Sequence, residues 1–315
     1  MVDALKLWAA LVWRDGSLLP LLSRHTHARA SFAGRFICIA SVYCFATRMA
    51  LAGSIFVSGH DADYHALLGP NTVGARHFMQ EALDFVRNGN RDPILLLLTS
   101  TANDSLGDHA DSEIGLLAAG YRNWDRPGNY YVTATASQFL TLNLSHYSAI
   151  LIPSDHGGSL TGDDLQAIDS RANDIISYLN AGGGLFALAE DGDHTRTSSG
   201  ADARLFGFLP FLATSAPKPQ NEQGYSLSAF GSSLGLFDSD VNGNFSHNVF
   251  TSTGGMTPVD FDASGEPVSL AYRGTIDPQS VPDAASTLTL ILLALTGCVG
   301  IRISWKAPKN QPEQG

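Results

Sequence analysis

Residues 149–189 read AILIPSDHGGSLTGDDLQAIDSRANDIISYLNAGGGLFALA, and this stretch decides the fold. Two continuous apolar runs, Ala149–Ile152 and Leu185–Ala189, have the composition of strands that are covered on both faces. Between them, Thr161 and Asp164 form a capping pattern at the start of a helix. The apolar residues that recur at helical spacing after this cap are Leu165, Ile168, Ala172, Ile175, Ile176 and Leu179. A strand, a helix and a second strand in this order predict a parallel sheet with right-handed crossovers.

The alternation of strands and helices continues on the N-terminal side of this unit. The further elements expected are strands at Ser54–Ser58, Ile94–Thr99 and Tyr130–Thr135 and helices at Gly74–Arg87 and Ser112–Ala119. On the C-terminal side, residues 201–275 are richer in Ser, Gly, Asn and Phe, and Val268–Tyr272 has a weak strand pattern. We predict one α/β domain over residues 53–275, with a less regular addition to the sheet near its C-terminal end.

Composition and charge exclude two classes of protein. The chain has 315 residues, of which 44% are hydrophobic, and this content excludes a disordered chain. The formal net charge is −11, but residues 53–283 alone carry 10 basic and 27 acidic side chains. Nucleic-acid affinity comes largely from lysine and arginine, so a segment this acidic excludes nucleic-acid binding.

Residues 1–52 have the pattern of a secretory signal. Three arginines precede the apolar run Phe36–Ala46, and the small residues Ala50 and Ala52 predict cleavage after Ala52. We therefore expect export by the secretion machinery. An uncleaved anchor or a buried helix is the alternative, and the length of the leader leaves open a translation start downstream of Met1.

The C-terminal end has the pattern of a membrane-spanning segment. Ala284–Ile301 contains 18 residues without a charge, and three cations follow it. This pattern predicts a transmembrane helix over residues 284–303 and a cytoplasmic tail over residues 304–315.

A sorting signature stands directly before this helix, where Val281, Pro282 and Asp283 end a linker of residues 276–283. A short signature with proline, one hydrophobic helix and then basic residues resemble the PEP-CTERM class of sorting tails, in its VPD variant. The resemblance implies that an exosortase recognises and cuts the tail in the inner membrane. The protein would then be periplasmic, at the cell surface or extracellular. A plain C-terminal membrane anchor is the alternative.

All three cysteines, Cys38, Cys44 and Cys298, lie in the two end segments. The domain at residues 53–275 therefore has no disulfide, no thiolate metal site and no cysteine nucleophile.

Polar residues gather directly after three of the expected strands. Ligands of an open parallel sheet bind outside the carboxyl ends of the strands, because loops and helix N-termini converge there. The residues that we assign to a ligand pocket at this edge are His60, Asp61, Asp155, His156, Gly157, Gly158 and Glu190. Glu190 and Asp155 are also the candidates for a catalytic role. Each residue has a turn or cap role as its alternative, and if all of them are structural the protein is a surface protein without a working pocket.

Part of this pattern resembles the class I glutamine amidotransferase-like superfamily, in particular its ThuA-like branch. The segments that carry the resemblance are Gly59-His60-Asp61, the loop Pro153–Gly158 and the segment Gly182–Phe186. The resemblance implies a flavodoxin-like three-layer αβα sandwich and an oxyanion hole near Gly157 and Gly158.

The catalytic cysteine of that superfamily would fall within Ala189–Gly192, where this chain has no thiol, so we expect no glutaminase chemistry. The ThuA-like branch also lacks this cysteine and has links to carbohydrate metabolism. The resemblance therefore implies a ligand-binding or envelope-associated protein, with carbohydrate as a candidate ligand.

A metal-dependent hydrolase is the alternative function. Imidazole and carboxylate groups suit Zn²⁺ or Mn²⁺. Water on the metal would attack a carbohydrate or related envelope substrate, and Glu190 or Asp155 would take the proton. The metal ligands expected are His60, Asp61, Asp63 and His65, with His156 or His247 to complete the set.

A calcium site is a second metal hypothesis. Asp238–Asn244 has oxygen-bearing side chains at alternate positions and glycine at the sixth, as in the first half of a calcium loop. The twelfth position is Val249, where such a loop needs glutamate. This excludes an EF-hand and leaves a weak calcium site or a plain Asn/Gly turn.

Overall fold

The structure is a computed structural model, which describes residues 52–100, 109–123, 130–158, 160–188, 198–199, 205–218, 223–244 and 246–276. The leader up to residue 51, the sorting signature, the expected transmembrane helix and Glu190 lie outside these residues. Within the described ranges, no helix is both long and apolar enough to cross a membrane.

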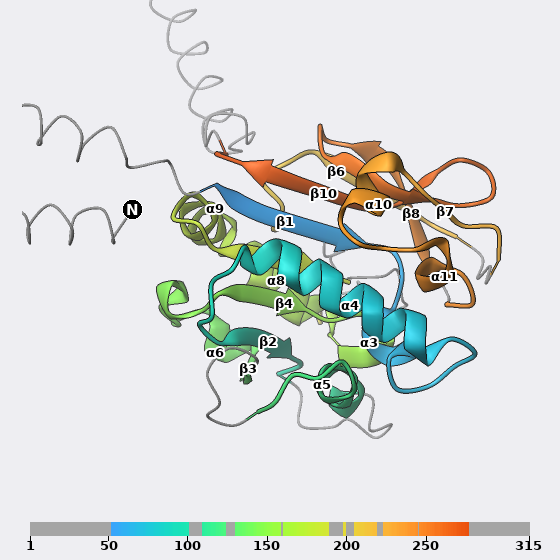
Figure 1. Cartoon of the computed structure of the whole chain (residues 1–315). Helices are drawn as coiled ribbons and strands as arrows, with labels where there is room; N and C mark the ends of the chain where they lie inside the picture. The colour runs from blue at the N-terminus through green and yellow to red at the C-terminus, as the bar shows by residue number, and fades with distance from the viewer. Residues whose placement is uncertain are drawn as a thin grey trace, which may run out of the picture. The chain divides into compact units, whose positions relative to one another are not determined.

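An eight-stranded sheet carries the fold, in the order β3-β2-β4-β5-β1-β10-β9-β7 (Figure 1). Its strands are β1 (Gly53–Ser58), β2 (Ile94–Leu98), β3 (Tyr131–Thr135), β4 (Ala149–Ile152), β5 (Gly184–Ala187), β7 (Ser226–Leu227), β9 (Thr257–Phe261) and β10 (Pro267–Gly274). The first five strands in the order run parallel, and the last three are added antiparallel. The prediction of an α/β domain with a large, mostly parallel sheet is confirmed.

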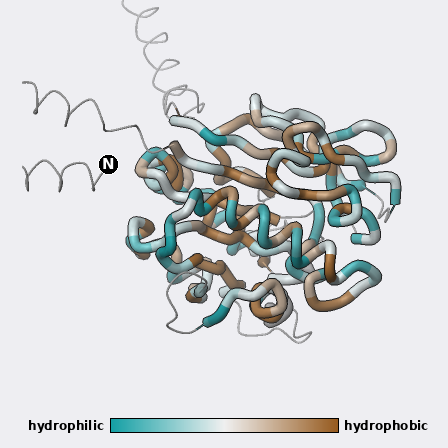
Figure 2. Tube along the Cα trace, in the orientation of Figure 1, coloured by the Kyte–Doolittle hydropathy of each residue, from teal (hydrophilic) through white to brown (hydrophobic). Residues whose placement is uncertain are grey.

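Helices pack on both faces of this sheet. The helices are α3 (Ala62–His65), α4 (Thr72–Arg87), α5 (His109–Ala118), α6 (Ala136–Phe139), α7 (Asp155–Gly158), α8 (Gly162–Asp169), α9 (Ala172–Asn180), α10 (Ala229–Ser233), α11 (Asp238–Val241) and the 3₁₀-helix η1 (Leu144–His146). On one face, α4 packs Phe78 and Leu83 in a cluster with Phe56. On the other face, α8 and α9 share a cluster with Ile55 and Val57. Hydrophobic and hydrophilic segments alternate along α4 in Figure 2, as one buried helix face requires.

The C-terminal part of the domain is more regular than the sequence indicates. The expected strand Val268–Tyr272 lies inside the longer β10, which pairs with β1 and β9. A separate two-stranded sheet joins β6 (Ala213–Pro217) to β8 (Asn248–Thr253).

One expected helix is wrong in its extent, because the stripe from Leu165 to Leu179 is divided between α8 and α9. The division falls at Ser170 and Arg171. The guanidinium of Arg171 donates hydrogen bonds to the carbonyls of Phe139 and Leu142, so the chain is held at this point by a contact distant in sequence. The apolar spacing continues across the division and therefore does not reveal it.

The carboxyl ends of β2 and β4 form the topological switch point of the sheet, since the chain leaves these neighbours toward opposite sides. Asp164 at the start of α8 bridges this point. Its Oδ2 accepts hydrogen bonds from Thr161 N at 3.0 Å and Thr99 Oγ1 at 2.9 Å, and its Oδ1 accepts one from Ser100 N at 3.0 Å. The expected capping pair of Thr161 and Asp164 is thus confirmed, and it also fixes the end of β2.

Asp164→Ala is expected to lower the free energy of unfolding by about 2 kcal/mol, because it removes a helix cap and leaves the buried Thr99 hydroxyl without its acceptor. Urea unfolding followed by circular dichroism measures the change. The neighbouring Asp163 is exposed, and Asp163→Ala should change the same quantity by less than about 0.5 kcal/mol. Equal effects of the two substitutions would contradict the bridging role of Asp164.

Candidate functional site

Buried polar side chains concentrate around the carboxyl end of β1. Those that lie on this strand end, the following loop and the strands beside it are Ser58, His60, Asp61, Asp63, His65, Ser246, Asn248, Asp260 and Ser269. Burial of so many polar groups is costly unless they are paired. Their partners therefore decide what this region can do.

Asp63 ties the loop after β1 to the loop after β4. Its Oδ2 accepts hydrogen bonds from Ser154 N at 3.0 Å and from the Ser112 hydroxyl on α5. Gly157 lies directly over this carboxylate, where a Cβ atom would collide with Asp63 and Ser112. Burial raises the pKa of Asp63, although the bonds from Ser112 and Ser154 oppose that shift. Two of the three expected polar clusters thus meet at one edge of the sheet.

Asp61 lies between two imidazoles. Its Oδ1 is 3.2 Å from Nε2 of His65, and its Oδ2 is 3.3 Å from Nε2 of His247. Burial alone would raise the pKa of Asp61, but the hydrogen bonds and charges of the two histidines outweigh it and lower the pKa to about 2. Asp61 is therefore a buried carboxylate anion at neutral pH.

His65 carries the charge that balances Asp61. Its Nδ1 lies 2.8 Å from the carbonyl oxygen of Leu68, and its Nε2 faces the Asp61 carboxylate. Burial alone would lower the pKa of His65, but the hydrogen bond and charge of Asp61 raise it above its ordinary value. Since both ring nitrogens face acceptors, the imidazolium form fits this position best.

His60 has a different partner, although it adjoins Asp61 in sequence. Its Nε2 lies 2.7 Å from Oδ2 of Asp260 on β9, and the two side chains are 2% and 0% exposed. The rings of Phe78 and Tyr225 pack edge-on against it, with centroids at 5.6 and 5.2 Å. His60 thus joins the strand end of β1 to the antiparallel part of the sheet.

The four side chains expected to share one metal ion are divided among three sets of partners. His60 bonds to Asp260, Asp61 to the histidines 65 and 247, and Asp63 to two serines. Within the part of the chain that the structure describes, no group of three His, Cys, Asp or Glu side chains could hold a metal ion. The side chains of Asp155, His156 and Glu190 lie outside that part.

The two glycines that resemble an oxyanion hole use their N–H groups within the loop. Gly157 N donates to Ser154 Oγ at 2.9 Å, and Gly158 N donates to the Ser154 carbonyl at 2.8 Å. These bonds form the single turn of α7. Both N–H groups of the expected oxyanion hole thus have acceptors within their own loop in this conformation.

The segment expected as a calcium loop begins with the short helix α11, Asp238–Val241. Asp238 Oδ1 accepts from Leu227 N at 2.9 Å, and Asn242 Oδ1 accepts from Gly224 N at 2.8 Å. Oδ2 of Asp240 lies 2.7 Å from Nδ1 of His77. Oxygens of alternate side chains thus take part in capping and turn contacts, as they would in a plain turn.

Sequence reasoning missed Ser112 and Asp260 as members of this region. Ser112 stands inside an expected helix, and Asp260 follows His60 by two hundred residues. Neither has a local sequence signal, because both matter only through contacts between distant segments. His247 was expected as a completing ligand, and its Nε2 lies 3.3 Å from Oδ2 of Asp61.

No family model, curated protein or solved structure matches this chain. We therefore infer the function from the chemistry of the described residues.

Proposed function

We propose that the chain is an exported, membrane-sorted protein whose domain at residues 53–275 is a non-catalytic, amidotransferase-like binding domain of the cell envelope. The leader pattern in residues 1–52 and the signature Val281-Pro282-Asp283 before an uncharged apolar run support export and sorting by an exosortase. Parallel strands with helices on both faces support the flavodoxin-like assignment, with β10, β9 and β7 as an addition to it.

One observation carries the non-catalytic part of this proposal: the titratable side chains around β1 are buried, and each is paired with another side chain. Asp61 is paired with two histidines, and His60 is paired with Asp260. A general base or nucleophile needs access to substrate, whereas Asp61 is 1% exposed and His60 is 2% exposed. Paired and buried in this way, these groups rigidify the edge of the sheet. His247, at 11% exposure, is the member of the set that a ligand reaches most easily.

We propose an envelope carbohydrate as the ligand of this edge, with the side chains of Asp155, His156 and Glu190 as further contacts. A domain without a thiol at residues 189–192 fits binding rather than glutamine hydrolysis. Carbohydrate recognition needs hydrogen-bonding side chains on a rigid support and no activated nucleophile.

Metal analysis separates this function from the hydrolase. The full chain, purified in mild detergent without added metal, is expected to contain Zn²⁺ and Mn²⁺ only in substoichiometric amounts. Its thermal unfolding midpoint should not change on chelation, because the buried pairs need no ion. One equivalent of either metal that is lost in His65→Ala and retained in His146→Ala, which changes an exposed histidine, would establish the hydrolase instead.

Binding is tested by cosedimentation of the full chain with polysaccharide isolated from the cells that produce the protein. The chain should sediment with the polymer, and His247→Ala should reduce the bound fraction while His146→Ala leaves it unchanged. A chain that stays in the supernatant would overturn the binding role.

A further inference from the structure

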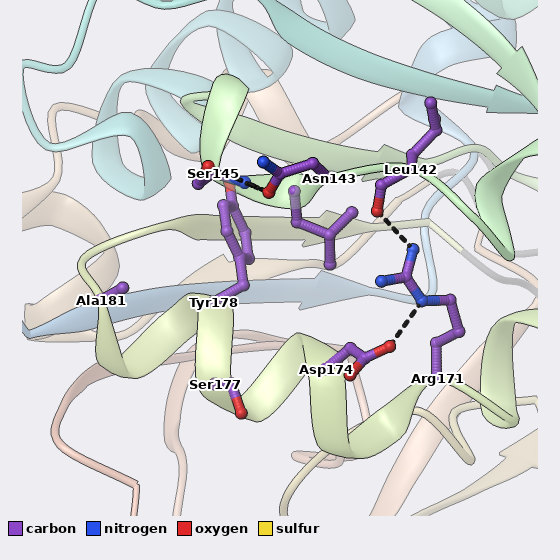
Figure 3. A pocket seen from close by; sticks show the side chains of 9 residues that line it. Leu142, Asn143, Ser145, Arg171, Asp174, Ser177, Tyr178 and Ala181 are labelled. Carbon is purple, nitrogen blue, oxygen red and sulfur yellow. Dashed lines mark hydrogen bonds and ion pairs between the residues drawn. The ribbon is translucent and has the colours of Figure 1, made fainter.

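A pocket of about 300 Å³ lies beside η1 and α9 (Figure 3), away from the proposed site at the carboxyl end of β1. The residues that line it belong to η1 and α9 or lie next to these helices in the sequence. Since η1 leads into β4 and α9 leads into β5, the pocket lies near the amino ends of these strands. This volume is at the lower end of ligand pockets and suits one small ring.

Arg171 gives the pocket a fixed hydrogen-bond donor. Its Nη1 donates to the carbonyls of Leu142, at 3.0 Å, and Phe139, and its Nε donates to Asp174 Oδ2 at 2.8 Å. The guanidinium also lies 4.9 Å from the centroid of the Phe139 ring. In Figure 3 the remaining terminal nitrogen of Arg171 points into the pocket. A donor that is already immobilised costs little entropy when it binds a ligand.

Asp174 balances the charge of this arginine at the rim. The carboxylate is 61% exposed and shares one oxygen with Arg171 Nε, so its other oxygen is open to a hydroxyl donor. An anionic ligand would meet this carboxylate within a segment that carries 27 acidic and 10 basic side chains, residues 53–283. The pocket therefore favours a neutral ligand that offers both donors and acceptors.

The inner wall of the pocket is apolar. Leu144 and Tyr178 are buried, and Leu142 is half-buried beside them. The Tyr178 hydroxyl is already used, because it donates to the Tyr147 carbonyl and accepts from Gly184 N, each at 3.2 Å. Tyr178 thus presents its ring carbons rather than its hydroxyl. An apolar wall with a charged but balanced rim matches a ring that has C–H groups on its face and hydroxyls on its edge.

We propose that this pocket binds one neutral pyranose unit. Arg171 donates to a ring hydroxyl, Asp174 accepts from a neighbouring hydroxyl, and the C–H face of the sugar packs on Leu144 and Tyr178. The assignment follows from the chemistry of this pocket, which is separate from the carboxyl edge, and it stands or fails independently of the proposed function.

Calorimetric titration of the full chain with methyl β-glucopyranoside tests the site. A ring of this size should bind with a Kd on the order of 1 mM. Ser177 is an exposed pocket residue on α9, and Ser177→Phe should fill the pocket and weaken binding by at least about tenfold. Asn173 is exposed on the same helix and does not line the pocket, so Asn173→Phe is the matched control. Its Kd should equal that of the unchanged chain.

Three outcomes would overturn the assignment, provided that both variants unfold at the same temperature as the unchanged chain. The first is no heat of binding at glucoside concentrations up to about 50 mM. The second is an equal Kd for Ser177→Phe and Asn173→Phe. The third is tighter binding of glucuronate, which has the same ring with a carboxylate. Polysaccharide cosedimentation reports on the carboxyl edge separately, since His247→Ala leaves this pocket unchanged.

Discussion

Asp61→Asn is expected to lower the free energy of unfolding by about 3–5 kcal/mol at neutral pH, because it removes one partner of a buried ion pair. The substitution keeps the size of the side chain but leaves the charge of His65 uncompensated in the interior. His247 loses its carboxylate at the same time. Urea unfolding of the purified chain measures the effect. As a control, Glu81→Gln changes a half-exposed pair, in which Glu81 lies 3.3 Å from His77, and should cost less than about 1 kcal/mol.

The pH dependence of stability should identify the same pair. The pKa of Asp61 falls from 3.8 to about 2 on folding, so its contribution is complete above pH 3.8 and is lost as the pH falls toward 2. The pKa of His65 rises on folding from 6.5, so its contribution is complete below pH 6.5 and is lost as the pH rises through the folded value. We expect the free energy of unfolding to be constant between these limits and to fall on either side of them. In Asp61→Asn the fall should be smaller on both sides. An unchanged profile in the variant would refute the charged pair.

Asp63→Ala is expected to cost about 3 kcal/mol, because it leaves the Ser112 hydroxyl and the Ser154 N–H buried without an acceptor. The loss should fall on the contact between the loops after β1 and β4, so hydrogen exchange should accelerate at Ser154 and Gly157 beyond the global change in stability. Denaturant unfolding and amide exchange together measure these effects.

Asp63→Asn is the matched control for this prediction. Burial raises the pKa of Asp63, so the site disfavours a charge, and a neutral amide keeps one oxygen for the same donors. It should therefore cost about 1 kcal/mol. If Asp63→Ala and Asp63→Asn cost the same, the hydrogen bonds of Asp63 do not hold the two loops together.

Local structure could be predicted where one short segment contains the whole signal. The apolar spacing and the Asn88-Gly89 ending place α4 to within two residues, and Asn88 indeed adopts the left-handed conformation with φ 48°. The capping pair at Thr161 is equally local. Strand order is not local, because periodicity shows that β1 is buried but does not name β5 and β10 as its neighbours.

In the candidate site, too, one part could be predicted from the sequence and another part could not. Sheet topology brings the loops after β1 and β4 together, as the rule for parallel strands predicts. The pairing of each side chain depends on side-chain direction and on segments two hundred residues away, such as Asp260 and His247. A pattern of residue types therefore placed His60 and Asp61 in one set, and only the fold assigns them to different partners.

The pairing of Gly53 with Gly274 in β1 and β10 has a mechanical consequence. These strands are antiparallel, so the polypeptide enters and leaves the domain at neighbouring points. Tension applied through the two ends would load the hydrogen bonds of this ladder one after another, as in a zipper, instead of all together. Opposing forces on residues 53 and 274 would therefore open the seam between β1 and β10 first, and at low force.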